Sequence, residues 1–219
     1  MLNLAALATS DVRTRPFRWS TPEQIVAPAS LSALARTFPR SGFLLTQRDR
    51  GTDKRYVMGA RRLWNRDGCA AAGPSLPTVW QELLAQLVSP EYCMSLGRLF
   101  DRDLTHDLVE VALVRYGVGG FVSAHRDKPQ KTVGHVLYFN ERWEPDWGGH
   151  FCLLNSEQED DVFARMLPRL GTSVVFERSE TSWHLVTPVT GKHDRLAVHV
   201  DFWSSDPGDA PGRSSTVRN

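Results

Sequence analysis

The chain has 219 residues, 41% of them hydrophobic and 23% charged, with a formal net charge of +1 at pH 7. These values are ordinary for a single globular domain with a sizeable core. The near-neutral net charge gives no reason to expect a nucleic-acid partner, which would need a concentrated basic face. No apolar run approaches the roughly 20 residues that a membrane span needs. The three cysteines, Cys69, Cys93 and Cys152, lack ligand-like spacing, which argues against a disulfide scaffold and favours a reducing cytoplasm.

The N-terminal region gives uneven signals. Residues 1–19 have no clear pattern and are predicted to be a leading strand or a loosely held arm. Ser20-Thr21-Pro22-Glu23 resembles a helix start, because a hydroxyl cap is followed by an early proline and an acid. A second helix is predicted to begin near Ser30 and to end before Pro39 and Gly42.

Residues 48–66 are rich in arginine. We predict a solvated loop and sheet edge here, with a short strand at 56–58. The alternative is a substrate-recognition lid that carries cations for an anionic group, because loops beside a rigid scaffold often carry specificity.

Two helices are predicted next. The first begins at Pro77 and has Val79, Trp80, Leu83, Leu84 and Leu87 on one face. The second begins at Ser89-Pro90-Glu91, which combines a cap, a first-turn proline and an acid. Both are expected to pack against a sheet.

After Asp107 the hydrophobic period changes to that of strands. Strands are predicted near residues 109–113, 121–125, 133–139, 150–154, 172–177, 183–186 and 195–203, with an acidic loop at 156–161. Many short strands joined by Gly- and Pro-rich turns indicate an all-β barrel or sandwich. We therefore expect a support region at 1–107 that adds helices, loops and part of the sheet, a β core at 108–203 and a flexible tail at 204–219.

A metal site is predicted from the spacing of polar residues in this core. His125 and Asp127 are separated by one residue, and alternation along a strand would direct both side chains to one ion. His184, in another predicted strand, is the best third ligand. The spacing recurs in His199-Val200-Asp201, but no later histidine could complete that set. Two imidazoles and one carboxylate form the ligand set of a non-haem iron(II) site with open coordination positions.

The other histidines are expected to lie outside the metal site. His193 falls in a turn and His106 in a loop, so both are predicted at the surface. His135 is predicted to be a satisfied core histidine, and His150 to serve packing.

A series of short motifs runs through the β core: Arg115-Tyr116-Gly117, His125-Arg126-Asp127, Leu137-Tyr138-Phe139-Asn140, Trp147-Gly148-Gly149-His150-Phe151, Val174-Val175-Phe176, His184-Leu185-Val186-Thr187-Pro188-Val189 and Arg195. In this order they resemble the catalytic core of the 2-oxoglutarate- and iron(II)-dependent oxygenases, in particular the prolyl-4-hydroxylase-like branch. The resemblance covers less than half of the chain, and the N-terminal half contributes no motif.

The resemblance implies a mainly β, double-stranded β-helix (jelly-roll) core supported by N-terminal helices. It implies an iron(II) ion held by His125, Asp127 and His184. Arg195 would bind the distal carboxylate of 2-oxoglutarate, since a guanidinium fork matches a carboxylate. Tyr138 would hydrogen-bond the same carboxylate, and Tyr116 would lie near the co-substrate, although its position is offset by one residue.

The implied activity is hydroxylation of an unactivated C–H bond with O₂ and 2-oxoglutarate, giving succinate and CO₂. We expect a small-molecule substrate, such as an amino acid derivative or an intermediate of specialised metabolism, and a cytoplasmic enzyme with no membrane partner. Alternatives are a peptidyl-prolyl hydroxylase, desaturation or cyclisation by the same site, a non-catalytic jelly-roll binding module, and a zinc hydrolase. Asp127 opposes halogenation, since related halogenases have a small residue there. The sequence leaves the substrate and the oligomeric state open.

The last predicted strand carries two further candidates. If Arg195 points inward, His199 and Asp201 point inward too, because side chains on a strand alternate. Inward polar groups are costly unless bonded. We hypothesise that His199 or Asp201 contacts the polar part of the substrate or the groups around the iron; the alternative is a His–Asp pair that satisfies itself at the barrel mouth.

Overall fold

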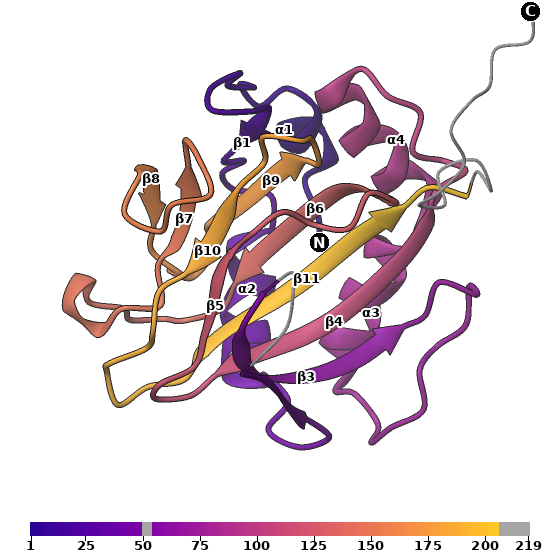
Figure 1. The fold of residues 1–219 in the computed structure, drawn as a ribbon. Helices are drawn as coiled ribbons and strands as arrows, with labels where there is room; N and C mark the ends of the chain where they lie inside the picture. The colour runs from indigo at the N-terminus through magenta and orange to yellow at the C-terminus, as the bar shows by residue number, and fades with distance from the viewer. Residues whose placement is uncertain (50–53, 206–219) are drawn as a thin grey trace, which may run out of the picture.

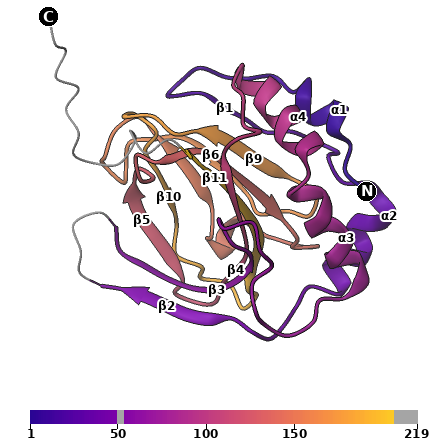
Figure 2. The same ribbon diagram turned by 90° about the vertical axis from the view of Figure 1, so that its right-hand side faces the viewer.

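The computed structural model describes residues 1–49 and 54–205, which form a curved antiparallel sheet with helices on one side (Figures 1 and 2). The helices are α1 (Leu4–Ala8), α2 (Pro28–Arg36), α3 (Thr78–Leu87), α4 (Pro90–Phe100) and the 3₁₀ helix η1 (Pro145–Trp147). The strands are β1 (Trp19–Ser20), β2 (Leu44–Arg48), β3 (Tyr56–Trp64), β4 (Leu108–Tyr116), β5 (Phe121–His125), β6 (Lys131–Tyr138), β7 (Phe151–Leu154), β8 (Val162–Met166), β9 (Ser173–Glu177), β10 (His184–Val186) and β11 (Arg195–Trp203).

The strand order is β1-β9-β6-β11-β4-β3-β5-β10-β7-β8, and β2 pairs with β3. β11 lies in the middle of the longer wall, between β6 and β4, while β5 and β10 lie across from it on the side away from the helices (Figure 2). This curled antiparallel sheet confirms the predicted mainly β, jelly-roll class.

Three hydrophobic clusters lie among the described residues, and β11 contributes to the two larger ones. Leu196, Val198, Val200 and Phe202 pack in the cluster shared with the helices, whereas Ala197 packs in the cluster inside the barrel. The alternation along the strand thus separates a supporting core from an inner face. The side chains that the helices contribute to the supporting core include Leu34, Trp80, Leu83, Leu87, Tyr92, Leu96 and Phe100.

The N-terminal segment is more ordered than its sequence indicates. The predicted helix start at Ser20 is wrong: Ser20 ends β1, pairs with Val175 of β9, and donates a side-chain hydrogen bond to the carbonyl of Asp11 at 2.8 Å. Leu7 and Trp19 are almost fully buried, so the segment is not a loose arm. Pairing of Ser20 with a strand distant in the sequence therefore outweighs the local pattern of residues that favours a helix cap.

The arginine-rich segment is mostly strand in its described part. β3 extends to Trp64 and pairs with β2, β4 and β5, so it is an internal strand rather than a loop or an edge. Arg61 is buried and donates to the carbonyls of Ser41 and Pro74. Residues 50–53, including Arg50, lie outside the described residues.

The remaining predictions concern the helices, the C-terminal tail and membrane spans. The helices predicted at Pro77 and Ser89 are confirmed as α3 and α4, and the second predicted helix begins at Pro28 instead of Ser30. Of the predicted flexible tail, residues 206–219 lie outside the described residues. In the described ranges no helix has the length and apolarity needed to cross a membrane.

Candidate metal centre

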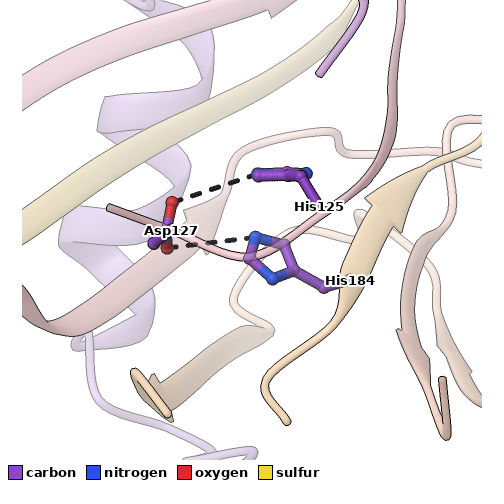
Figure 3. Close-up of side chains that lie close together, drawn as sticks. All are labelled: His125, Asp127 and His184. Atoms are coloured by element: carbon purple, nitrogen blue, oxygen red, sulfur yellow. Dashed lines mark ion pairs between the residues drawn. The ribbon is translucent and has the colours of Figure 1, made fainter. Parts of the chain in front are cut away.

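Three predicted ligands converge inside the barrel (Figure 3). His125 ends β5 and His184 begins β10, and the two residues are direct partners in the register of these strands. One ligand atom from each of His125, Asp127 and His184 lies within 4.8 Å of the others. Each imidazole Nε2 is 3.9 Å from a different oxygen of the Asp127 carboxylate. A single ion can therefore reach all three groups.

Asp127 reaches this position by a different route from the one predicted. β5 ends at His125, so Asp127 lies in the turn that leads to β6 and shares no strand face with His125. The strand-alternation argument is wrong in its reason, although the residue is in place. Arg126 points away, as expected: it pairs with Glu180, and its guanidinium lies 4.7 Å from the centre of the Trp183 ring.

The two imidazoles are oriented by backbone carbonyls. His125 Nδ1 lies 2.9 Å from the Ser123 carbonyl, and His184 Nδ1 lies 3.0 Å from the Ser182 carbonyl. A carbonyl only accepts hydrogen bonds, so each Nδ1 carries the proton and each Nε2 presents a lone pair toward Asp127. A hydrogen bond at one ring nitrogen that fixes the tautomer and orientation is typical of metal-binding histidines.

The charge states also suit a divalent cation. Burial lowers the pKa of His184 to about 4, and burial together with the neighbouring His184 lowers the pKa of His125 well below its ordinary value. Burial alone would raise the pKa of Asp127, but the adjacent Lys131 ammonium holds it below the ordinary range. At neutral pH the site therefore offers two neutral imidazoles and one carboxylate.

Arg195 lies behind the metal centre and is fully buried. Its Nε donates to the Gly149 carbonyl at 2.9 Å, and its Nη2 donates to the Tyr138 hydroxyl at 3.3 Å. Its Cζ is 4.9 Å from the ring centres of both Tyr116 and Tyr138. Nη1 is buried and makes no hydrogen bond within the described residues. Leaving such a charged donor unpaired is costly, which indicates a missing acceptor.

The site fits both an iron(II) ion and 2-oxoglutarate. The donor set of two imidazole nitrogens and one carboxylate suits a non-haem iron with open positions. The unpaired Nη1 of Arg195 suits a carboxylate, which accepts from a guanidinium in a bidentate manner. Tyr116 joins the two parts, since it lines the cavity at the metal ligands and also packs on Arg195.

The inner face of β11 is as predicted, but the partners of its polar residues are not a His–Asp pair. His199 and Asp201 both line the cavity, yet no ion pair joins them in the part of the chain that the structure describes. Asp201 pairs with Lys131 at 2.6 Å. His199 Nε2 is buried without a hydrogen-bond partner among the described residues, and its pKa is lowered by burial and by Arg195 and Lys131.

Sequence reasoning missed two cations of this site. Lys131 is buried and pairs with Asp127 at 2.8 Å, and Lys54 lines the same cavity, which measures about 150 Å³. The only sequence signal for Lys131 is its position four residues after Asp127 in a short turn. Lys54 lies next to residues outside the described ranges and carried no pattern.

The other histidines lie outside the metal centre, as expected. His135 faces the helices, is fully buried, and its Nδ1 lies 2.7 Å from the Tyr92 hydroxyl. His193 stacks on Trp147 with ring centres 4.7 Å apart. His150 contacts the hydroxyl of Thr187.

Comparison with known proteins agrees with this geometry. Residues 111–203 match the family model of the 2OG-Fe(II) oxygenase superfamily. No curated protein matches the chain by sequence.

Among solved structures, a Pseudomonas putida prolyl-4-hydroxylase is 23% identical, with a TM-score of 0.61 over 91% of this chain and 96% of that one. A prolyl hydroxylase from Trichoplax adhaerens, in complex with a hypoxia inducible factor peptide fragment, is 14% identical, with a TM-score of 0.60 over 92% and 87%. The non-heme alpha ketoglutarate dependent epimerase SnoN from nogalamycin biosynthesis is 10% identical, with a TM-score of 0.56 over 92% and 83%. At these identities the likeness establishes a shared fold.

Proposed function

Residues 111–203 belong to the 2OG-Fe(II) oxygenase superfamily, and from this premise we propose that the protein hydroxylates an unactivated C–H bond of a small molecule. Enzymes of this superfamily use iron(II) as cofactor and 2-oxoglutarate and O₂ as co-substrates. We assign the metal to His125, Asp127 and His184, and the distal carboxylate of 2-oxoglutarate to Arg195.

One observation carries this proposal. Two Nε2 lone pairs and an ionised carboxylate converge in a buried cavity, and a buried guanidinium with an unsatisfied nitrogen lies behind it. When bound, iron(II) and 2-oxoglutarate supply the coupling of oxidative decarboxylation, which yields succinate and CO₂, to oxidation of the substrate C–H bond. The protein holds the ion, fixes the carboxylate and excludes water.

Arg195, Tyr138 and Tyr116 have different roles in the proposed binding of 2-oxoglutarate. In this proposal Nη1 and Nη2 of Arg195 hold the distal carboxylate, and the Tyr138 hydroxyl, already 3.3 Å from Nη2, completes its hydrogen bonds. Tyr116 packs against the guanidinium and also lines the cavity at the metal ligands. Burial raises the pKa of Tyr138 to about 12, so its hydroxyl stays protonated and can donate.

Of the two polar residues on the inner face of β11, Asp201 is paired with Lys131, which leaves His199 as the candidate for a substrate contact. We propose that His199, whose Nε2 has no hydrogen-bond partner in the described ranges, contacts the polar part of the substrate or co-substrate. Replacement by a similarly sized leucine should raise the KM of one of the two, and unchanged KM and turnover would refute the assignment.

The cavity limits the size of the group that can reach the metal ligands, whether a small molecule or one side chain of a peptide. Its volume of about 150 Å³ lies below the range of about 300 to 1,000 Å³ of clefts that bury drug-sized ligands. The alternative within the same chemistry is a peptidyl-prolyl substrate, which the shared fold of the two prolyl hydroxylases favours. Desaturation or cyclisation would need no different residue at the site.

The test is a mass-spectrometric screen for succinate and an oxygenated product. Purified protein, iron(II) and 2-oxoglutarate are incubated in air with free amino acids, carrier-bound amino acids and proline-containing peptides. Asp127→Ala serves as the inactive variant, and His193→Ala as a control that removes a histidine outside the site.

Each outcome separates two readings. A free or carrier-bound small molecule that yields succinate supports the proposal, and a response confined to peptides supports the prolyl alternative. A product that has lost two hydrogens indicates desaturation or cyclisation. Activity that needs zinc but no oxygen indicates a hydrolase. Succinate formation no greater than that of Asp127→Ala across the whole panel would leave only a binding module.

Two broader assignments remain proposals. We propose a cytoplasmic enzyme, which three free cysteines support, and cell fractionation with detection of the native chain tests this. We also propose that residues 1–107 support a catalytic core at 108–203, because α3 and α4 cover the outer face of β11 (Figure 2). Expression of 108–203 alone should give insoluble protein.

A further inference from the structure

We propose that Lys131 is a positioning residue that holds one oxygen of the Asp127 carboxylate, so that the other oxygen faces the metal, and that Asp201 anchors Lys131 in turn. This inference rests on the metal centre proposed above. It assigns to Asp201 a role through Lys131 instead of a contact with the substrate.

The contacts form a continuous chain in which the lysine is buried and the two carboxylates are partly buried. Lys131 Nζ lies 2.8 Å from Asp127 Oδ2 and 2.6 Å from Asp201 Oδ1. The ammonium is also 5.4 Å from the centre of the Phe176 ring. Lys131 is only 7% exposed. A buried ammonium is costly unless paired and bonded, and here two carboxylates face it from different segments.

The backbone makes a special place for this side chain. β6 and β11 change register between Phe202 and Trp203, so that Trp203 pairs with Lys131 and Phe202 with Val133. The extra residue turns Lys131 to the inner face, whereas simple alternation would group it with Val133 and His135 on the helix side. Gly134 completes the arrangement, because a Cβ there would lie 2.9 Å from Lys131 Nζ.

Lys131 supplies what Asp127 otherwise lacks. The two histidine ligands lie at strand ends, and each is oriented by a carbonyl two residues away. Asp127 lies in a turn, and no strand pairing sets the direction of its side chain. Lys131 provides the equivalent constraint, so each of the three ligands has its own orienting partner. Such partners typically contribute 10- to 100-fold to metal affinity.

The test measures metal binding without turnover. Co(II) is titrated into the purified full-length protein, and its visible d–d absorption gives both the Kd and the coordination geometry. Lys131→Met should weaken Co(II) binding by about 10- to 100-fold and change the shape of the d–d bands, since the carboxylate is then free to rotate.

A matched variant separates this role from a structural one. Thr132→Val alters the neighbouring residue of β6, which is equally buried and whose hydroxyl donates to Asp107 instead of Asp127. It should lower the Tm while leaving the Co(II) Kd and spectrum unchanged. An equal loss of Co(II) affinity in Thr132→Val and Lys131→Met would show a structural effect and overturn the proposal.

Asp201 provides an independent arm. Asp201→Asn should weaken Co(II) binding less than Lys131→Met, and the double variant should match Lys131→Met alone, because Asp201 acts through the lysine. Additive losses would overturn the chain of contacts. If Lys131→Met does not fold, Asp201→Asn decides: a Kd within about twofold of the wild-type value would refute the proposal.

Failure of this inference and failure of the proposed metal centre look different. The metal centre would be refuted if the wild-type protein binds no Co(II). It would also be refuted if the His184→Ala protein binds Co(II) with the affinity of the wild type. If the Lys131→Met protein binds Co(II) with the affinity and spectrum of the wild type, the role of Lys131 is refuted and the metal centre stands.

Discussion

Replacement of Arg195 by methionine tests the co-substrate site most directly. Methionine fills much of the same buried space without the guanidinium, so the change removes the proposed fork to the distal carboxylate of 2-oxoglutarate. Hydrogen bonds to charged groups contribute about 1.5 to 3 kcal/mol each. Loss of two should cost about 3 kcal/mol or more of binding free energy, which is at least roughly 100-fold in the Kd of 2-oxoglutarate.

The assay is an anaerobic titration of the iron(II)-loaded protein with 2-oxoglutarate, followed by the visible absorption of the chelate. The affinity for iron(II) alone should change little, because among the described residues Arg195 bonds to Gly149 and Tyr138 and to none of the three metal ligands. Folding stability should fall by about 1 to 3 kcal/mol for each of the two buried acceptors left without its donor.

Arg61→Met is the matched control. Arg61 is the other arginine that is buried among the described residues, and it also donates to backbone carbonyls, but at Ser41 and Pro74, away from the metal ligands. It should lower stability and leave the 2-oxoglutarate Kd unchanged. A folded Arg195→Met protein that binds 2-oxoglutarate like the wild type would refute the reasoning about the unpaired Nη1.

Three further predictions follow from the ligands and the core. His184→Ala should abolish stoichiometric iron(II) binding, as measured by metal analysis after gel filtration, since two protein ligands remain; retention of one equivalent would contradict the ligand assignment. Burial lowers the pKa of His135 to about 3 against about 6.5 when unfolded, so below pH 6.5 the unfolded chain takes up a proton that the folded chain refuses. The free energy of unfolding should therefore fall by up to several kcal/mol from pH 6.5 to 3, an effect measured by urea denaturation that should shrink in His135→Phe. Tyr92→Phe removes the hydroxyl 2.7 Å from His135 Nδ1 and should destabilise the fold by about 1 kcal/mol in urea denaturation without changing the 2-oxoglutarate Kd.

Strand alternation predicted the inner face of β11 correctly. Arg195 and His199 point into the barrel and Val198 and Phe202 point toward the helices, because β11 is regular and paired on both sides. The long strands β4, β6 and β11 were recognisable for the same reason. The three metal ligands were predicted from the order of the motifs along the chain. The structure explains why two of them meet: His125 and His184 are paired in the register of β5 and β10.

The features that escaped prediction depend on contacts distant in sequence. Lys131 faces inward only because β6 shifts register against β11, and no pattern of residues within β6 reveals that shift. β8 has alternating exposure and, among the described strands, pairs with β7 alone, so its sequence shows no continuous apolar run. Ser20 carries a helix-cap pattern, but the partner that decides its conformation, Val175, is far along the chain.

The shared use of β11 has a consequence for engineering and evolution of this enzyme. Its odd-numbered residues from Arg195 to Asp201 face the inside of the barrel, while its even-numbered residues pack against the helical layer. Repacking at Val198 or Val200 would therefore displace Arg195, His199 and Asp201 on the opposite face of the same backbone. Gains in thermal tolerance are best sought in α3 and α4, where a substitution can improve the packing without shifting the strand that carries the proposed co-substrate site.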